Sequence, residues 1–167
     1  MAQERYTRTN QKIFFAGLAL DAWAASGGVP GRIQAEQEAC LFHLYGAMLG
    51  LCHEVTGFYR TPQADAGTVE AILNRPVLDA NPTPELAELL ELAESPSSWL
   101  AGLLRHYHAL FEPPRAPAKA KQDPGMAIID AVSLDEKPTE LTLEQLQAWR
   151  GELKALVLRF RESMTEW

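Results

Sequence analysis

The side chains capable of acid–base or ligand chemistry gather on and just after one apolar stretch, residues 40–52. His43 and His53 lie on this stretch or at its end, ten residues apart. On an α-helix that spacing separates them by about 80° of rotation and 15 Å of rise, so they cannot share a metal ion. Cys40 with His43 supplies only two of the ligands that a zinc-type site needs. The sequence therefore predicts no metal site and no cofactor.

A denser polar cluster follows the apolar stretch, formed by His53, Glu54, Tyr59 and Arg60. One interpretation makes it the mouth of a pocket, with His53 as acid or base and Arg60 holding an anion. The other makes it the end of a helix emerging into solvent, with Arg60 close to the negative end of the helix dipole. No third catalytic partner is identifiable, so we assign no catalytic residue.

Gly46 and Gly50 stand four residues apart on the same stretch. Glycine weakens a helix interior by about 1 kcal/mol relative to alanine, so a face of small residues indicates close approach of another backbone. The alternative is a ligand cavity beside the glycines. In that case the candidate ligand-binding residues are His43, Gly46, Gly50, His53, Glu54, Tyr59 and Arg60.

Several function classes are disfavoured by the rest of the sequence. Ser97 and Ser98 lack the glycine-framed turn of a serine nucleophile, and no glycine-rich loop follows a strand. The net charge of −7 and the pI near 5.1 argue against general affinity for phosphate backbones, so we expect no nucleic-acid partner.

The elements that must position these side chains are helical. The central segment, about residues 33–60, is apolar at nearly every angle around a helix, which requires neighbours to enclose it. Its uninterrupted apolar run is shorter than the roughly 20 residues of a membrane span. We therefore predict the buried central helix of a bundle, and no membrane span.

Five further segments have helical periodicity or start signals, and no strand pattern competes with them. Thr83-Pro84 and Thr142 with Gln145 are typical of helix starts. The sequence predicts an all-α, single-domain bundle of about four to six helices over residues 1–167. The expected additional helices are 5–25, a short one near 68–73, one from 83, 96–111 and one from 142.

A proline-rich basic linker is predicted at 113–125, followed by a short apolar segment at 126–132 that we expect to lie across the bundle. Acidic residues concentrate between 63 and 98, where the local net charge is −6. Arg150, Lys154 and Arg161 line up on the last helix. Glutamates are interspersed among them, which favours a solvated face of mixed charge.

Cys40 and Cys52 are the only cysteines, and twelve residues of helix hold them about 18 Å apart. Two buried, unpaired thiols are typical of a reducing cytoplasm, which is the predicted location. The alternative is export, with residues 1–24 as a signal peptide. Arg5, Arg8 and Lys12 precede a short apolar run there.

Three segments, residues 6–12, 39–54 and 158–162, resemble a family of short bacterial proteins that is known only as a domain of unknown function. The similarity extends over nearly the whole chain. It implies a bacterial, non-secreted protein and supplies no activity, cofactor or catalytic residue.

The function we predict is that of a non-enzymatic helical module acting through protein–protein contacts, with a homodimer as the expected form. The wide first helix, the four tryptophans and the segment 126–132 exceed the apolar surface that a few helices need. The alternative is a small-molecule-binding or enzymatic bundle with a pocket near His43 and His53.

Overall fold

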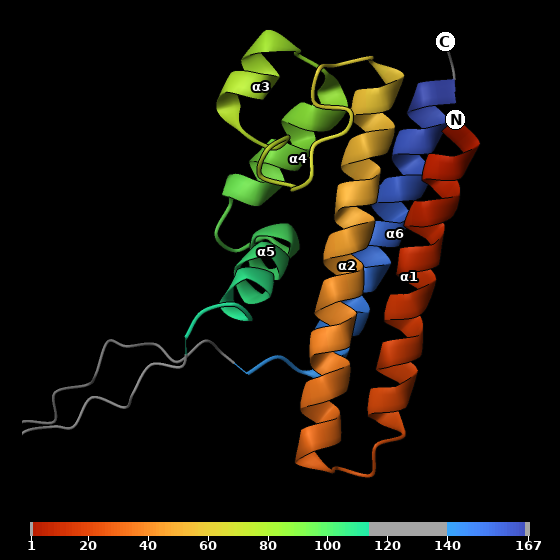
Figure 1. Ribbon diagram of the computed structural model, residues 1–167, viewed down its shortest axis with the longest axis vertical. Coiled ribbons are helices and arrows are strands. Elements are labelled where there is room, and N and C mark those ends of the chain that lie inside the picture. The colour runs from red at the N-terminus through yellow and green to blue at the C-terminus, as the bar shows by residue number, and fades with distance from the viewer. Residues whose placement is uncertain (1, 114–139, 166–167) are drawn as a thin grey trace, which may run out of the picture.

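The computed structural model describes residues 2–113 and 140–165, which form six α-helices and no strand. The helices are α1 (Ala2–Ala24), α2 (Pro30–Phe58), α3 (Arg75–Ala80), α4 (Pro84–Glu94), α5 (Trp99–Ala109) and α6 (Leu143–Thr165), labelled in Figure 1. The predicted all-α fold is confirmed.

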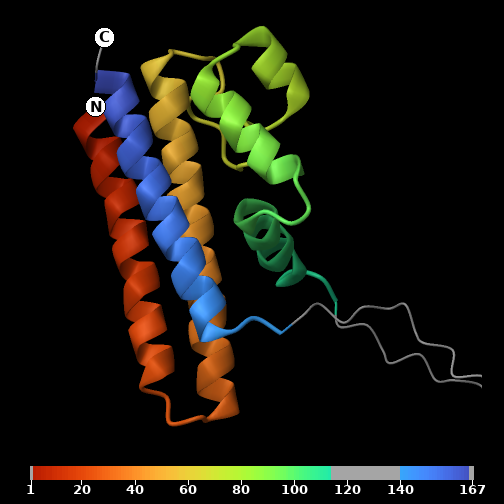
Figure 2. The same ribbon diagram turned by 180° about the vertical axis from the view of Figure 1, so that it is seen from behind.

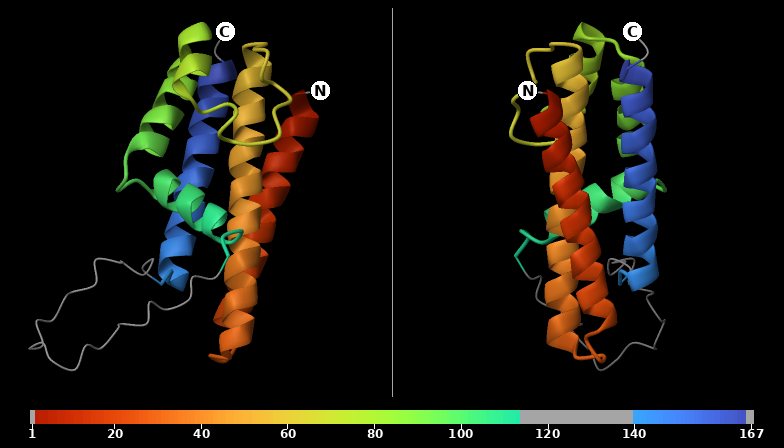
Figure 3. Two further views of the ribbon diagram at one scale, coloured as in Figure 1. Left: turned by 60° about the vertical axis from the view of Figure 1, so that its left-hand side comes forward. Right: turned by 90° about the vertical axis from the view of Figure 1, so that its right-hand side faces the viewer.

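Three long helices run side by side: α1, α2 and α6 (Figures 1 and 2). The start of α1 and the end of α6 lie at the same end of the bundle. The shorter helices α4 and α5 flank α2 on the side away from α1, and α5 also contacts α6 (Figure 3). The helix α1 contacts two neighbours, α2 and α6.

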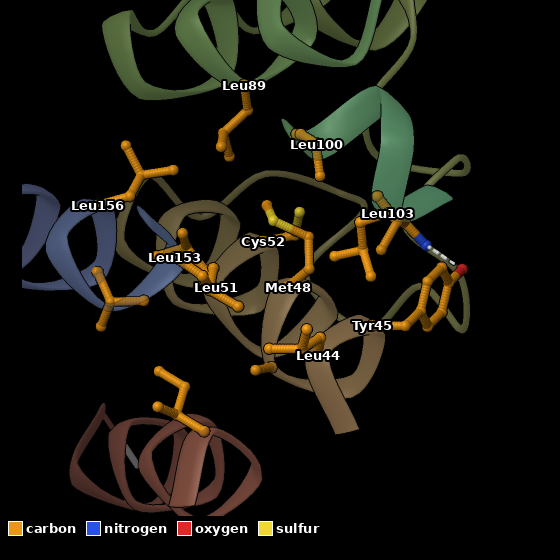
Figure 4. Packing of buried hydrophobic residues seen from close by; sticks show 14 of the residues in the cluster. Leu44, Tyr45, Met48, Leu51, Cys52, Leu89, Leu100, Leu103, Leu153 and Leu156 are labelled. Atoms are coloured by element: carbon orange, nitrogen blue, oxygen red, sulfur yellow. Dashed lines mark hydrogen bonds between the residues drawn. The ribbon is translucent and has the colours of Figure 1, made fainter. Parts of the chain in front are cut away.

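The core is centred on α2, as predicted for the central helix. Leu44, Met48 and Leu51 are fully buried and point between the surrounding helices (Figure 4). Both cysteines are buried and free. Two phenylalanines of α2 escape this enclosure, because Phe42 stays 43% exposed and Phe58, the last residue of the helix, 42%.

The turn between α1 and α2 depends on two glycines. Gly27 and Gly28 have φ values of +64° and +78°, a region that residues with a Cβ rarely adopt. Pro30 then opens α2, three residues before the predicted start, because a proline in the first turn lacks only an N–H that would have no helical partner.

We call the interface between α1 and α2 the α1–α2 seam. Along it, glycines of α2 lie against side chains of α1. A Cβ added to Gly50 would lie 3.4 Å from the Cα of Thr9, and one added to Gly46 would touch Lys12. At Gly57 the guanidinium of Arg5 occupies the place of a Cβ. The close-approach interpretation of Gly50 is thereby confirmed.

The helix start predicted at Thr142 is also confirmed. Thr142 and Gln145 exchange the two hydrogen bonds of a capping box, at 2.9 and 3.1 Å. Leu146, Leu153 and Phe160 recur at seven-residue spacing along α6 and are buried.

The predicted helix at 68–73 is wrong: this stretch forms turns, and the short helix lies at Arg75–Ala80. The Asn74 side chain caps the Val77 amide, which starts α3 after the turns. Val69 and Ile72 are buried core residues on irregular backbone, so their apolar spacing reflects burial and not a helix.

The linker predicted at 113–125 and the segment at 126–132 lie outside the described residues, apart from Pro113. Within residues 2–113 and 140–165, no helix combines the length and apolarity that crossing a membrane requires.

Candidate functional site

A hollow of about 230 Å³ opens beside the α1–α2 seam, near the N-terminal end of α1. Its lining consists of Arg5, Arg8, Gly50, His53, Ala64 and Asp65. Of the candidate ligand-binding residues, the structure brings Gly50 and His53 together here. His43 and Gly46 lie elsewhere along the same seam.

His53 and Arg5 form the fixed wall of this hollow. The Nε2 of His53 lies 2.7 Å from the carbonyl oxygen of Ala66, so this nitrogen carries the proton and donates it. The backbone carbonyl of His53 accepts a 2.8 Å hydrogen bond from Arg5. These two contacts tie the loop after α2, the end of α2 and α1 to one another.

His43 lies in the seam against the edge of the Phe15 ring, at 5.4 Å between centroids. Burial, assisted by the positive charge of Lys12, lowers the pKa of His43 below its ordinary value of 6.5. His43 is therefore neutral at pH 7 and packs as an aromatic side chain.

Glu54 points away from the hollow, into the junction of α1, α2 and α6. It is 3% exposed and accepts two hydrogen bonds from the guanidinium of Arg161, at 2.8 and 2.9 Å. Arg161 also donates to Asn10 and to the backbone carbonyl of Tyr6, and lies over the Tyr6 ring. We call these four residues the Glu54–Arg161 network.

The prediction that Arg161 and Arg150 face solvent is wrong. Arg161 is taken up by this network, and Arg150 crosses Gly17 to donate a 2.8 Å hydrogen bond to the backbone carbonyl of Ile13. Both arginines therefore connect α6 to α1.

Tyr59 and Arg60 also serve the end of α2. The Tyr59 hydroxyl donates to Glu85, a buried carboxylate at the start of α4 that also accepts from Ser163. Burial and the bond to Glu85 raise the pKa of Tyr59 to about 12. Arg60 adopts a φ of 55° while the Thr61 amide bonds back to Thr56, which terminates the helix.

A second surface feature was not predicted, a row of aromatic rings that we call the aromatic belt. It consists of Phe14, Phe15, Phe42, His43, Tyr107 and Phe111. Phe15 contacts Phe14 and His43, and Phe42 contacts Tyr107 and Phe111, with centroids 5.3 to 6.3 Å apart within these two groups. The two groups use consecutive residues of α2, Phe42 and His43, and together they span α1, α2 and the C-terminal end of α5.

The outer rings of the belt are open to solvent. Phe14 is 58% exposed, Phe42 43% and Phe111 63%. By contrast, Trp23, Trp99 and Trp149 pack against the core. The surplus apolar surface therefore lies on phenylalanines and not on these tryptophans.

A polar cluster supports the belt from beneath. Tyr45 stacks on Tyr107 at 3.7 Å, donates to Glu70 and accepts from the Val69 amide. Burial opposes ionisation of Glu70, but hydrogen bonds from His108, its own backbone and Tyr45 outweigh burial and lower its pKa. This cluster holds Tyr45 in place, and Tyr45 in turn positions the Tyr107 ring that contacts Phe42.

No activated nucleophile or metal site occurs within the described residues. Burial raises the pKa of Cys40 to about 12 and that of Cys52 further, so both thiols stay protonated. Nowhere in 2–113 or 140–165 do three metal-binding side chains converge.

A broader groove of about 560 Å³ lies between the start of α2, the end of α5 and the segment before α6. Ile33, Leu41, Leu110 and Leu141 give it apolar walls, and Glu38 and Glu140 line it as well. His106 is its only histidine. Burial and the charge of Arg105 lower the pKa of that side chain.

Three carboxylates of the acidic stretch at 63–98 pair with basic side chains of the same chain. Glu88 pairs with Arg159 of α6, Glu94 pairs with Arg75, and Glu70 pairs with His108. The first of these pairs connects α4 to α6, the second connects α4 to α3, and the third connects the turns before α3 to α5.

Sequence reasoning missed the partners that complete each site. Arg5 and Arg8 were considered only as residues before a short apolar run, and their position beside Gly50 and His53 depends on how α1 packs. Glu54 and Arg161 are 107 residues apart, a separation over which no local spacing signal exists.

The fold and sites define an all-helical bundle held by buried polar networks, with a cationic hollow and an exposed aromatic belt. The chain belongs to DUF6586, a family of unknown function, whose model matches residues 1–167. No curated protein and no solved structure matches the chain. The resemblance on residues 6–12, 39–54 and 158–162 is confirmed at the level of a domain of unknown function, and these segments meet at the Glu54–Arg161 network.

Proposed function

We propose that this chain is a non-enzymatic helical module that acts through protein–protein contacts and forms a homodimer through its aromatic belt. The observation that carries the proposal is the exposure of Phe14, Phe42 and Phe111, the outer rings of the two aromatic groups that form the belt. Contiguous exposed apolar surface is typical of association sites, whereas single exposed apolar residues are common everywhere.

Two features favour a second copy as the partner. The chain carries a net charge of −7, so two copies repel unless they meet at a face poor in acid. The rings of the belt carry no acidic group, and the positively charged Lys12 lies 6.0 Å from the Phe15 ring centroid. A twofold interface pairs the same patch with itself, and aromatic rings can pair edge to face across it.

The test is the molar mass in solution, measured by light scattering across a concentration series. The wild-type chain is expected to be dimeric at high concentration. Phe42→Ser and Phe111→Ser should each weaken dimerisation by about tenfold or more, as expected for central aromatic contacts.

Leu158→Ser provides the matched control. Leu158 is 53% exposed, comparable to the belt rings, but lies on α6 outside the belt. It should leave the dimerisation constant unchanged. A strictly monomeric wild type, or equal weakening by Leu158→Ser, would contradict the proposal.

A second candidate function is ligand binding at the α1–α2 seam, in the region first assigned to His43, Gly46, Gly50, His53, Glu54, Tyr59 and Arg60. The hollow at Gly50 and His53 favours it. Because Glu54 and Tyr59 are engaged by Arg161 and Glu85, we propose that such a ligand uses the residues lining the hollow instead. The test is a neutral fragment library screened by amide chemical shifts around Gly50.

We further propose a cytoplasmic, bacterial protein organised as one domain over 1–167. Two buried free thiols favour a reducing compartment. Ile13, Ala16 and Leu20 of α1 belong to the core, so removal of residues 1–24 as a signal peptide would expose the seam of α2. Thiol titration of protein from intact cells tests the compartment, and both cysteines should be reduced.

A further inference from the structure

We propose that the hollow beside the α1–α2 seam binds a phosphoryl-type oxyanion between Arg5 and Arg8. The inference names the ligand class for the second candidate function and does not depend on dimerisation through the belt. It rests on the fixed guanidinium of Arg5, on Arg8 in the same lining, on the weakly paired carboxylate of Asp65 and on the size of the hollow.

The Arg5 guanidinium is held in place before any ligand arrives. One nitrogen donates to the backbone carbonyl of His53 at 2.8 Å, and the side chain lies across Gly57, where any Cβ would displace it. The side chain keeps 30% of its surface exposed, so the rest of the fork faces solvent. A guanidinium with fixed geometry loses less entropy when it binds an oxyanion.

Arg8 supplies a second positive charge to the same lining. Among the described residues no carboxylate lies within 4 Å of its guanidinium, so no ion pair competes for it there. Two arginines that line one hollow are typical of sites for oxyanions, because the planar fork matches the oxygen geometry of phosphate and carboxylate.

Asp65 is the one carboxylate in the lining, and it is a weak competitor. It lies 3.7 Å from Arg5 and its side chain is 97% exposed. Exposed pairs of this kind contribute little, because solvent screens them. An anion with stronger charge and more oxygen atoms can take its place beside Arg5.

The size of the hollow limits the kind of ligand that can bind in it. Its volume of about 230 Å³ is below the roughly 300 Å³ at which pockets for organic ligands begin. It therefore suits a free inorganic anion or the phosphoryl end of a larger molecule. Gly50 and Ala64 add little side-chain bulk to the lining.

The experiment is an NMR titration of the full chain with inorganic phosphate, with O-phosphoserine, and with sodium chloride at matched ionic strength. The Nε–H signals of Arg5 and Arg8 and the amides of Gly50 and Ala64 should shift saturably, with a Kd on the order of 1 mM. Binding of both phosphate and phosphoserine assigns a phosphoryl site. Binding of phosphate alone assigns a free-anion site, and either result supports the proposal.

Variants separate this site from general charge effects. Arg8→Gln should weaken binding roughly three- to tenfold, and Asp65→Asn should tighten it about two- to fivefold. Arg32→Gln changes the net charge equally on an exposed residue outside the hollow, and should leave the Kd unchanged. All three positions are exposed, so the fold is expected to persist.

Shifts no larger than those with chloride, or equal Kd values for wild type and Arg8→Gln, would overturn the proposal. Neutral fragments that bind at the Gly50 amide without any phosphate binding would preserve ligand binding and reject the oxyanion. Absence of both would reject the second candidate function as well. Dimerisation is measured separately and is unaffected by these outcomes.

Discussion

Glu54 and Phe42 lie on the same helix, α2, but the charged side chain is buried and the apolar one is exposed, the reverse of the usual distribution. The carboxylate is 3% exposed, whereas the aromatic ring is 43% exposed. Around Glu54, α1 and α6 supply a guanidinium, an amide and a carbonyl that satisfy one another. Around Phe42 the rings contact each other, but nothing in the described part of the chain covers their outer side.

The difference indicates which region serves the fold and which serves a partner. A buried charge persists only where every partner is present, so the Glu54–Arg161 network ties three helices together. An exposed set of aromatic rings gains nothing from water, so the aromatic belt gains free energy only when another surface covers it. Variants in the two regions should therefore change different quantities.

The largest expected effect on stability comes from Arg161→Met. It leaves Glu54 buried without a cation, and removing one partner of a buried pair typically costs about 3–5 kcal/mol. Urea denaturation measures the loss in the free energy of unfolding. Arg159→Gln breaks the more exposed pair with Glu88 and should cost no more than about 1 kcal/mol. Equal losses for the two variants would contradict the structural role of the network.

The second largest expected change in stability comes from a substitution in the α1–α2 seam. Gly50→Ala forces a methyl group against Thr9 and should cost about 1–3 kcal/mol. Gly151→Ala is the matched control, because a Cβ there meets no atom within 4 Å. It should stabilise α6 by up to about 1 kcal/mol. Thermal denaturation of both variants gives the sign, and a stabilised Gly50→Ala would contradict the close approach of α1.

The smallest expected effect is on the pH at which acid unfolds the chain, and it involves Glu70 and His108 in the polar cluster beside the belt. The pKa of Glu70 is lowered in the folded chain, so its ionised form stabilises the fold. That contribution is complete above about pH 4.5 and is lost as the pH falls through the folded pKa. His108→Gln removes a hydrogen bond that lowers this pKa, so acid unfolding should begin at a higher pH.

The background Glu70→Gln provides the control for this prediction. With no carboxylate at position 70, the substitution of His108 should no longer move the acid midpoint. Circular dichroism against pH measures the midpoint in each variant. A shift that persists in the Glu70→Gln background would assign the effect to another group.

The parts of the fold that depend on local signals could be predicted from the sequence. Thr142 with Gln145, and Thr83 with Pro84, mark helix starts through contacts within four residues, and both caps are present. Spacing alone could not separate buried turns from a helix at 68–73. Val69 and Ile72 have apolar spacing in either case, and the cap at Asn74 decides where α3 begins.

The sites depend on contacts between distant residues, which explains why they were predicted only in part. Glu85 lies in the first turn of α4, and it is buried because Tyr59 and Ser163 approach it from the end of α2 and from α6. The structure places His53, one of the candidate ligand-binding residues, beside a hollow, while the cations beside it come from α1. Their proximity follows from the α1–α2 seam and not from sequence spacing.

The most direct test of the central claim is a filtered NMR experiment on a mixture of isotope-labelled and unlabelled wild-type chains. If two copies meet at the aromatic belt, nuclear Overhauser effects should connect the ring protons of Phe14, Phe42 and Phe111 in one copy with belt protons of the other. A dimer whose intermolecular effects arise only outside the belt, for example around Leu158, would contradict the account, and so would a chain that stays monomeric at every concentration.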